Sequence, residues 1–398
     1  MNKTKLVMKM GAFSKKDLIA LQSKPLEEKQ QISLARIGEW FNYWEHEVYV
    51  AFSGGKDSTV LADLCAKWCY VIRKPLYLCF VDTGLEYPEI RNHVKFFADW
   101  LRNKYGIEVI LDIVRPKMRF DQVITEYGYP IISKEVSSTI RGARSNILNG
   151  VYSLRLCKLG VTTGEYGGLY DSGEYNYAGS LENSKFKAHK WKPLIDVDCD
   201  ISEQCCYVMK KAPLAEYEKR TGRKPIIGTM ACESMNRESA WFKNGCNAFD
   251  SKKARSAPMS FWMNQDVLHY IKNDNIPIAS VYGEVVRADH IINDGVNQYE
   301  QMSFSDFGLI ENGETEILQT TGCNRTGCMF CGFGCHMEKD GERRFERLKK
   351  THPRQYQYCI GGGEYDENGV WKPNKKGLGL GHVFDELNKI YGDDFIKY

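Results

Sequence analysis

Hydrophobic positions along the chain alternate between short continuous runs and longer stretches with helical spacing. The run Val48 to Phe52 is apolar, rich in β-branched residues and followed by a glycine pair, which is typical of a strand buried on both faces. Similar runs predict strands at 76–81 and 107–114. Apolar positions at helical spacing predict helices at 15–46, 59–72 and 88–105. Strands that alternate with helices of this length indicate βαβ units and a parallel sheet.

This regular alternation is interrupted after about residue 133. The stretch from about 133 to 195 is rich in Gly, Ser and Tyr, which predicts a long insertion. A helix at 203–221, a strand at 225–229 and a helix at 261–273 are expected next, with one helix at 343–350 near the end. We therefore expect an α/β fold, a parallel sheet with helices on both faces. Its parts are an N-terminal helical region (1–45), an α/β domain (46–285) and a cysteine-rich C-terminal region (286–398).

Composition narrows the class of protein. The 398 residues are 43% hydrophobic, as in an ordinary globular protein, and the net charge of +3 is too small to indicate nucleic-acid binding by itself. No stretch approaches the roughly 20 apolar residues of a membrane helix, and residues 1–16 lack the apolar core of a signal peptide. We therefore expect a cytoplasmic protein without a membrane partner. In that compartment the 14 cysteines are expected to include metal or redox ligands.

The segment Ser53 to Ser58 has the pattern of a phosphate-binding loop. A strand that stops at Gly54-Gly55 and restarts as a helix points several backbone N–H groups at one place, where the helix dipole also favours an anion. Lys56 adds a positive charge, Ser53 and Ser58 add hydroxyls, and Asp57 would cap the helix or hold Mg²⁺. The alternative is a structural glycine turn with an ordinary cap. The six residues together, in strand–loop–helix context, favour phosphate.

These six residues resemble the pyrophosphate loop of the ATP-pyrophosphatase superfamily, which includes the PAPS and APS reductases. Asp82-Thr83-Gly84 is similar to the segment of that superfamily that lies against the nucleotide. Gly228-Thr229 with Glu233-Ser234 and Arg237 resembles the stretch that closes over it. The resemblance runs in order over about 35–340. It implies a Rossmann-like fold of the adenine nucleotide alpha hydrolase type and a bound adenine nucleotide.

Two cysteine pairs extend the resemblance to the iron–sulfur branch of the PAPS/APS reductase family. Cys205-Cys206 and the later Cys328-x-x-Cys331 are similar to the residues that hold the [4Fe–4S] cluster in APS reductases. Four thiolates would enclose such a cluster, although zinc accepts the same ligands. Cys323 and Cys335, with Cys328 and Cys331, form a competing set within one segment. We favour the first set and keep Cys323 and Cys335 as alternative ligands or reactive thiols.

Basic residues gather in the expected insertion. They are interleaved with Phe186 and Trp191, a combination that could hold a nucleic-acid strand by phosphate contact and base stacking. The alternatives are a solvated loop or contacts to the nucleotide's own phosphates. The residues concerned are Arg141, Arg144, Arg155, Lys158, Lys185, Lys187, His189, Lys190 and Lys192.

Two departures from the reductases shape the expected reaction. The loop keeps Lys56-Asp57, as in enzymes that cleave ATP, and the last residues, 379–398, lack the cysteine with which the reductases attack sulfur. We therefore expect Mg-ATP to activate an acceptor, with AMP and pyrophosphate as products, for sulfur transfer to nucleic acid or a small molecule. Lys56, Asp57, Glu233 and Arg237 are the expected catalytic residues, with Arg237 offsetting nucleotide charge and Glu233 orienting Arg237 or the metal.

Two donor proteins and two alternative functions follow from the same resemblance. A cysteine desulfurase or a thioredoxin-like protein would donate sulfur or electrons. The first alternative function is a phosphoadenylyl- or adenylyl-sulfate reductase, with APS or PAPS as substrate and sulfite as product. The second is a non-catalytic nucleotide sensor or complex subunit.

Overall fold

The structure is a computed structural model that describes residues 13–150, 153–159, 161, 188–249, 254–288, 316–341 and 343–398. The chain divides into two compact units. The first, here called the α/β unit, comprises Met1–Asp82, Glu86–Arg115 and Pro213–Thr326. The second, the cysteine-rich unit, comprises Thr83–Leu85, Pro116–Ala212 and Gly327–Tyr398.

A six-stranded sheet forms the centre of the α/β unit, in the order β3-β2-β1-β5-β7-β6. Neighbouring strands from β3 to β7 are parallel, and β6 alone runs antiparallel, against β7. In the register, Val50 of β1 lies opposite Leu78 of β2 and Ile226 of β5. The expected α/β fold is confirmed. The strands are β1 Val48–Ala51, β2 Leu76–Val81, β3 Val109–Val114, β5 Lys224–Ile226, β6 Asn247–Ala248 and β7 Arg255–Ser256.

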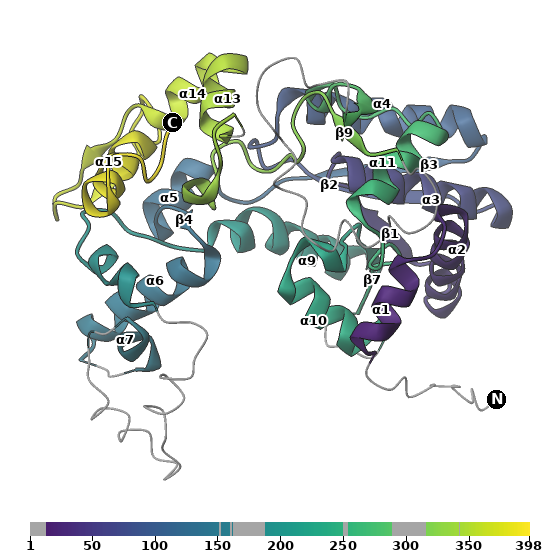
Figure 1. Ribbon diagram of the computed structural model, residues 1–398, viewed down its shortest axis with the longest axis horizontal. Helices are drawn as coiled ribbons and strands as arrows, with labels where there is room; N and C mark the ends of the chain where they lie inside the picture. The colour runs from purple at the N-terminus through teal and green to yellow at the C-terminus, as the bar shows by residue number, and fades with distance from the viewer. Residues whose placement is uncertain are drawn as a thin grey trace, which may run out of the picture. The chain divides into compact units, whose positions relative to one another are not determined.

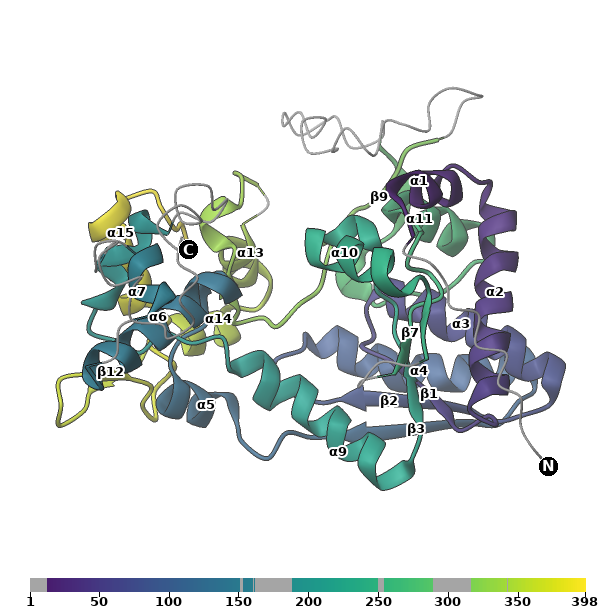
Figure 2. The same ribbon diagram turned by 90° about the horizontal axis from the view of Figure 1, so that it is seen from below.

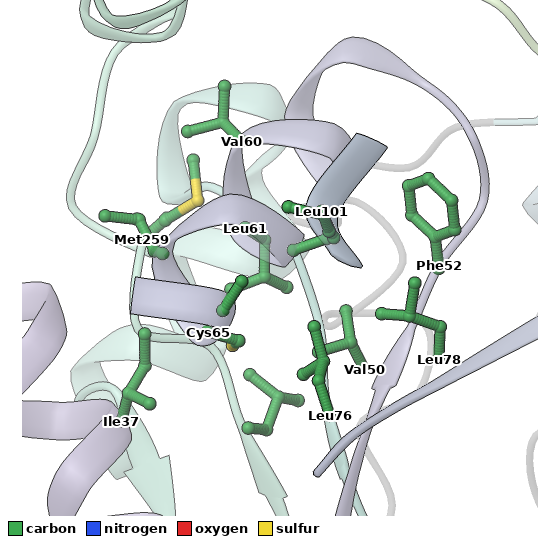
Figure 3. Close-up of a cluster of buried hydrophobic side chains, with 14 of the residues drawn as sticks. Ile37, Val50, Phe52, Val60, Leu61, Cys65, Leu76, Leu78, Leu101 and Met259 are labelled. Atoms are coloured by element: carbon green, nitrogen blue, oxygen red, sulfur yellow. The ribbon is translucent and has the colours of Figure 1, made fainter. Parts of the chain in front are cut away.

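Alternate residues of the strands face two different layers. Val50, Leu78 and their neighbours pack into the main core with helices α2 (Leu26–Tyr43), α3 (Lys56–Ile72) and α4 (Pro88–Tyr105). Figure 3 shows Val50, Leu61 and Leu78 within this core. On the opposite face, Tyr49 and Cys79 pack against Tyr217 of α9 (Ala212–Thr221). Helices therefore cover both faces, as expected, and Figure 2 shows α4 and α9 on opposite sides of the strands.

Helix ends follow local chemistry. The single helix expected at 15–46 is wrong: α1 (Lys15–Gln22) and α2 are separate, because Pro25 cannot continue a helix and instead stands at the start of α2. Both are labelled in Figure 1. Helix α3 begins at Lys56, earlier than expected, so the loop residues Lys56 to Ser58 form its first turn. Helix α4 agrees with the expectation, with Pro88 at its start and Gly106 (φ 63°) after its end.

The rest of the α/β unit consists of short turns, two helices and a hairpin. It contains a short turn (η4, Ala231–Glu233), the helices α10 (Met235–Asn244) and α11 (Asn264–Asn273), and a second short turn (η5, Ser280–Tyr282). A hairpin of β8 (Val285–Arg287) and β9 (Leu318–Thr320) follows. Among the contacts that hold this region is a buried ion pair between Lys29 and Asp266, at 2.7 Å.

The cysteine-rich unit is mainly helical. The sequence predicted one helix after residue 322, whereas the described residues of that stretch form three, α13, α14 and α15. Strand β10 pairs in parallel with β4, placing Gly332 beside Ile131. The unit's elements are α5 Phe120–Tyr127, β4 Ile131–Ile132, α6 Lys134–Leu148, α7 Leu154–Lys158, η2 His189–Ile195, the π-helix η3 Tyr207–Lys211, β10 Gly332–Phe333, η8 Cys335–Met337, α13 Arg344–Thr351, α14 Pro353–Ile360, β11 Glu364–Tyr365, β12 Trp371–Lys372 and α15 Leu380–Tyr391.

Candidate functional site

The glycine pair after β1 is required by geometry. Gly54 has φ 74°, which L side chains rarely adopt, and an added Cβ would lie 2.8 Å from Val94 Cγ2 and 2.9 Å from Ile90 Cγ2. Gly55 is the N-cap of α3, and because glycine has no side chain it makes no capping hydrogen bond to the helix. The loop therefore presents backbone at the start of a 17-residue helix, which is an electropositive position.

Hydroxyl groups organise this loop. The Ser53 and Ser58 Oγ atoms are 3.0 Å apart, and Ser58 Oγ donates to the Gly55 carbonyl at 2.9 Å. The Lys56 backbone N–H donates to the Tyr282 hydroxyl at 3.2 Å, and that hydroxyl lies 2.6 Å from Thr326 Oγ1. Burial raises the pKa of Tyr282 to about 12, so its hydroxyl stays neutral. Thr326 was not expected at the loop, and nothing in its local sequence signals this contact.

The Lys56 side chain is buried and paired with its neighbour in sequence. Its Nζ lies 2.8 Å from Asp57 Oδ1, and only 6% of the side chain is exposed. Asp57, at 26%, reaches solvent more readily. Of the two roles considered for Asp57, helix capping is not seen, because its carboxylate is turned to Lys56. The pair leaves one ammonium and one carboxylate at the same helix terminus.

Glu233 and Arg237 form an ion pair across the first turn of α10. Glu233 Oε2 also accepts from the Met230 backbone N–H at 2.7 Å. Burial, and then the positive charge of Arg325, lower the pKa of Arg237, while the charge of Asp57 opposes this. The Gly228 segment lies against the loop, because a Cβ added at Gly228 would stand 3.2 Å from the Asp57 carbonyl oxygen. Arg325 is a cation that the sequence did not single out.

Asp82 lies at the end of β2 and is held by two arginines. Its Oδ2 is 2.8 Å from Arg91 Nη2 and 3.4 Å from Arg115 Nε. Thr83 and Gly84, the next two residues, belong to the cysteine-rich unit. There Thr83 Oγ1 accepts from the Leu85 backbone N–H at 3.2 Å, and Gly84 has φ 76°.

The adjacent cysteines of the second unit form a polarised pair. Their sulfur atoms are 4.0 Å apart. The hydrogen bond from Cys205, with the positive charges of Lys134 and Lys210, lowers the pKa of Cys206 to about 5. The same hydrogen bond, and then burial, raise the pKa of Cys205. The two neighbouring thiols are therefore not equivalent.

Cys328 and Cys331 belong to the same unit as this pair. A turn joins them, with the Cys331 N–H donating to the Cys328 carbonyl at 3.2 Å. Arg344 Nη1 donates to the Cys331 carbonyl at 3.0 Å, and burial raises the pKa of the Cys331 thiol. The four favoured cysteines are thus all in one unit and within electrostatic range of Cys205.

The two alternative ligands differ in their surroundings. Cys335 is in the same unit, and its thiol donates to the Cys331 carbonyl at 3.4 Å, while burial raises its pKa. Cys323 belongs to the α/β unit and packs into a small apolar cluster with Ile90, Ala279 and Tyr282. Cys323 therefore has the surroundings of a core residue.

The donor set suits a thiolate-bound metal by its chemistry. Iron–sulfur clusters and zinc both bind soft thiolate ligands. Here one of the four thiols, that of Cys206, has a lowered pKa and stands near two lysines. Across the ranges that the structure describes, no group of three or more His, Cys, Asp or Glu side chains is already arranged to hold a metal ion.

Part of the basic group expected to contact nucleic acid is used inside the fold. Arg144 donates to four backbone carbonyls between Leu194 and Cys199, and Arg141 pairs with Glu203 at 2.6 Å. Trp191 is buried against His336 and Tyr391. Arg144 and Trp191 are therefore used inside the fold, whereas the Arg141 side chain, although paired with Glu203, stays 40% exposed. Lys185, Phe186 and Lys187 lie outside the described residues.

Comparisons with known proteins were made against families, curated proteins and solved structures. The profile of the family described as "Phosphoadenosine phosphosulfate reductase domain" matches residues 47–138 and 172–332, more than half of the chain. No curated protein matches. An NMN synthetase from Francisella tularensis matches at 14% identity and a TM-score of 0.29, over 64% of this chain and 72% of that chain. An NAD+ synthetase from Burkholderia pseudomallei matches at 13% and 0.27, over 64% and 70%.

None of the helices in the described ranges is long and apolar enough to cross a membrane.

Proposed function

The chain belongs to the phosphoadenosine phosphosulfate reductase domain family, and we propose that it uses ATP to activate an acceptor for sulfur transfer, releasing AMP and pyrophosphate. The observation that carries this proposal is the buried Lys56–Asp57 pair at the start of α3. ATP has β- and γ-phosphates that the Lys56 ammonium group could bind. A sulfonucleotide has neither of these phosphates. The chain's membership of this family supports an adenine nucleotide as the ligand.

The loop residues would act on the triphosphate. An oxygen of the acceptor attacks the α-phosphorus, a new P–O bond forms, and the bond between the α-phosphorus and the bridging oxygen breaks, releasing pyrophosphate. Lys56 and the backbone N–H groups of the loop stabilise the leaving charge, which is catalysis by preorganised donors. Asp57, whose carboxylate is the more exposed member of the pair, would hold Mg²⁺, and a bound Mg²⁺ would neutralise phosphate charge.

Arg237 and Glu233 have supporting roles in this proposal. Arg237 offsets the negative charge of the nucleotide, because it stands within electrostatic range of Asp57. Glu233 holds Arg237 through their ion pair, and its own position is fixed by the Met230 N–H. In a second step a sulfur nucleophile bonds to the activated atom of the acceptor and AMP leaves. The acceptor would be nucleic acid or a small molecule, and a cysteine desulfurase or thioredoxin-like protein would supply the sulfur or electrons.

We assign Cys205, Cys206, Cys328 and Cys331 to a [4Fe–4S] cluster. The acidic Cys206 thiol beside Lys134 and Lys210 supports thiolate ligation. A bound cluster would supply electrons or an iron site for sulfur. Zinc is the alternative occupant of the same residues. Thiolate ligands of this kind persist in a reducing compartment, so we place the protein in the cytoplasm.

A second candidate function follows from the family itself, namely reduction of adenylyl or phosphoadenylyl sulfate to sulfite. The test compares both reactions in one preparation. Anaerobically purified protein is incubated with Mg-ATP and an oligonucleotide or nucleoside acceptor, and separately with each sulfonucleotide and a thiol reductant. AMP and pyrophosphate from ATP support the proposal, and both should be lost in Lys56→Met but not in Lys74→Gln, an exposed lysine at the opposite end of the sheet. Sulfite from a sulfonucleotide, without AMP from ATP, would establish the reductase instead.

A further inference from the structure

A hollow at the end of strands β2 and β3 is lined by several charged and polar side chains. We call it the β2–β3 pocket and define it by Asp82, Arg91, Asn92, Lys95 and Arg115. Arg91, Asn92 and Lys95 come from the first turns of α4, and Arg115 directly follows β3. Phe80 and Ile113 supply apolar wall. None of the three cations was singled out by the sequence.

The pocket carries more positive than negative charge. Its three cations face one carboxylate, and two of them share a single oxygen, because Arg91 Nη2 and Arg115 Nε both approach Asp82 Oδ2. Lys95 lies four residues after Arg91, on the same face of α4. In the described parts of the chain, no carboxylate is within 4.0 Å of the Lys95 ammonium group. A metal cation is therefore disfavoured here.

The carboxylate orients the two guanidinium groups. Asp82 is buried, with 7% of its surface exposed, whereas the side chains of Arg91 and Arg115 are 47% and 75% exposed. A guanidinium group has five N–H donors in a rigid fork, so an arginine that uses one side toward Asp82 keeps others for a ligand. The forked donors, the Lys95 ammonium and the Asn92 amide match the several oxygens of a tetrahedral anion.

We propose that the β2–β3 pocket binds a phosphate group at a position separate from the α3 loop. Strand β3 is the edge of the sheet and β2 separates it from β1, after which the loop comes. The two phosphate sites therefore lie over different strands of one sheet edge. The source of the phosphate would be a phosphate monoester or the phosphodiester of a nucleic-acid strand. The proposal does not depend on the ATP reaction.

The test measures ligand binding through the chemical labelling of arginines that line the pocket. Phenylglyoxal modifies exposed guanidinium groups, and peptide mass spectrometry reports modification at Arg91 and Arg115 separately from Arg73, an exposed arginine at the end of α3. Full-length protein is labelled alone, with inorganic phosphate, and with a dinucleotide that carries only a phosphodiester. We expect saturating ligand to slow labelling of Arg115 by about tenfold and to leave Arg73 unchanged, as for a charge-assisted contact.

Two variants test whether the protection of Arg115 depends on the pocket. Lys95→Gln should reduce the protection of Arg115 at a given ligand concentration, while Lys74→Gln, which removes an exposed lysine at the far end of β2, should not. Protection by inorganic phosphate alone identifies a monoester ligand, and protection by the dinucleotide identifies a strand; either supports the site. Unprotected Arg115 with both ligands, or equal protection of Arg73, would overturn the proposal. ATP turnover is not measured, so failure here leaves the proposed reaction untouched.

Discussion

The hydroxyl of Tyr282 accepts a hydrogen bond from the backbone N–H of Lys56, at 3.2 Å. This places a tyrosine oxygen on one of the donors at the start of α3, where a phosphate oxygen would accept. The two residues are 226 positions apart, and Thr326 Oγ1, 2.6 Å from the same hydroxyl, fixes the tyrosine. The Tyr282 hydroxyl therefore stands where a phosphate oxygen would accept from the loop.

Tyr282→Phe should make the protein more dependent on nucleotide. Without the hydroxyl the buried Lys56 N–H loses its acceptor, which costs about 1–2 kcal/mol of the free energy of unfolding. A phosphate would restore that acceptor, so ATP should raise the Tm of the variant by more than it raises the wild-type Tm. Differential scanning fluorimetry with and without Mg-ATP measures both shifts. Thr326→Val is the control, because it removes a hydroxyl partner of Tyr282 but not the acceptor of the Lys56 N–H. Equal ATP shifts in Tyr282→Phe and wild type would contradict the prediction.

Gly54→Ala should be far more damaging than an alanine at another left-handed glycine of the same unit. At Gly54 the added Cβ meets Val94 and Ile90 below 3.0 Å, so strain and steric overlap together should cost about 3 kcal/mol or more. Gly106, at φ 63° with nothing within 4 Å of an added Cβ, should lose only about 1 kcal/mol. Urea unfolding of both variants gives the comparison. Similar losses would mean that the close approach of the loop to α4 is not essential.

Lys56→Met should remove most of the ATP-dependent activity with little effect on the fold. A preorganised cation on the leaving phosphates is worth about 3 kcal/mol, so kcat/KM for ATP should fall by about 100-fold. Steady-state pyrophosphate release measures this. Asp57→Asn should retain binding but require more Mg²⁺, since the carboxylate would be the metal's ligand. A Lys56→Met enzyme with wild-type kcat/KM would show that the buried ammonium has only a structural role.

Single cysteine variants should separate the two ligand sets. After anaerobic reconstitution with iron and sulfide, Cys206→Ser should lose bound iron and visible absorbance, because it removes the acidic thiolate of the set. Cys323→Ser should keep both, since Cys323 packs in the apolar cluster of the other unit. Iron analysis per chain and circular dichroism of both variants provide the measurements. Iron lost from Cys323→Ser, with its secondary structure intact, would favour the competing set.

His93 should make the α/β unit less stable in mild acid. The ring is buried between α4 and α3, with Nε2 3.2 Å from Thr59 Oγ1, and burial lowers its pKa to about 4. An unfolded chain binds a proton at about pH 6.5, whereas the folded histidine stays neutral until about pH 4. The free energy of unfolding should therefore fall as the pH drops from about 6.5 to 4, by up to about 3 kcal/mol.

His93→Gln should remove that part of the pH dependence. Urea unfolding at pH 7, 6 and 5, followed by tryptophan fluorescence, compares the two proteins over the window. Parallel curves for the variant and the wild type would mean that His93 has the same pKa in the folded protein as in the unfolded chain. Thr59→Val, which removes only the hydroxyl partner, should keep most of the wild-type slope because burial is the cause of the shift.

The sequence by itself determined the elements that depend on neighbouring residues. Apolar runs located β1, β2 and β3, the proline and glycine at its ends fixed α4, and the strand–glycine–helix order placed the loop at Ser53 to Ser58. These features are set by local backbone preference and periodicity, which are readable in one chain. Helix α15 was also readable, since Leu380, Val383, Phe384 and Leu387 are buried along one face, but its glycine-rich surroundings obscured it.

Only the tertiary structure decided which distant side chains meet. Nothing near Thr326 indicates that its hydroxyl lies beside Tyr282, and nothing near Arg115 indicates that it shares a carboxylate oxygen with Arg91. Cys323 and Cys328 are close in sequence, and the cysteine spacing made both of them candidate metal ligands. The fold places them in different units. Such contacts depend on the packing of strands and helices that are far apart in the chain. The local pattern of residue types does not specify that packing.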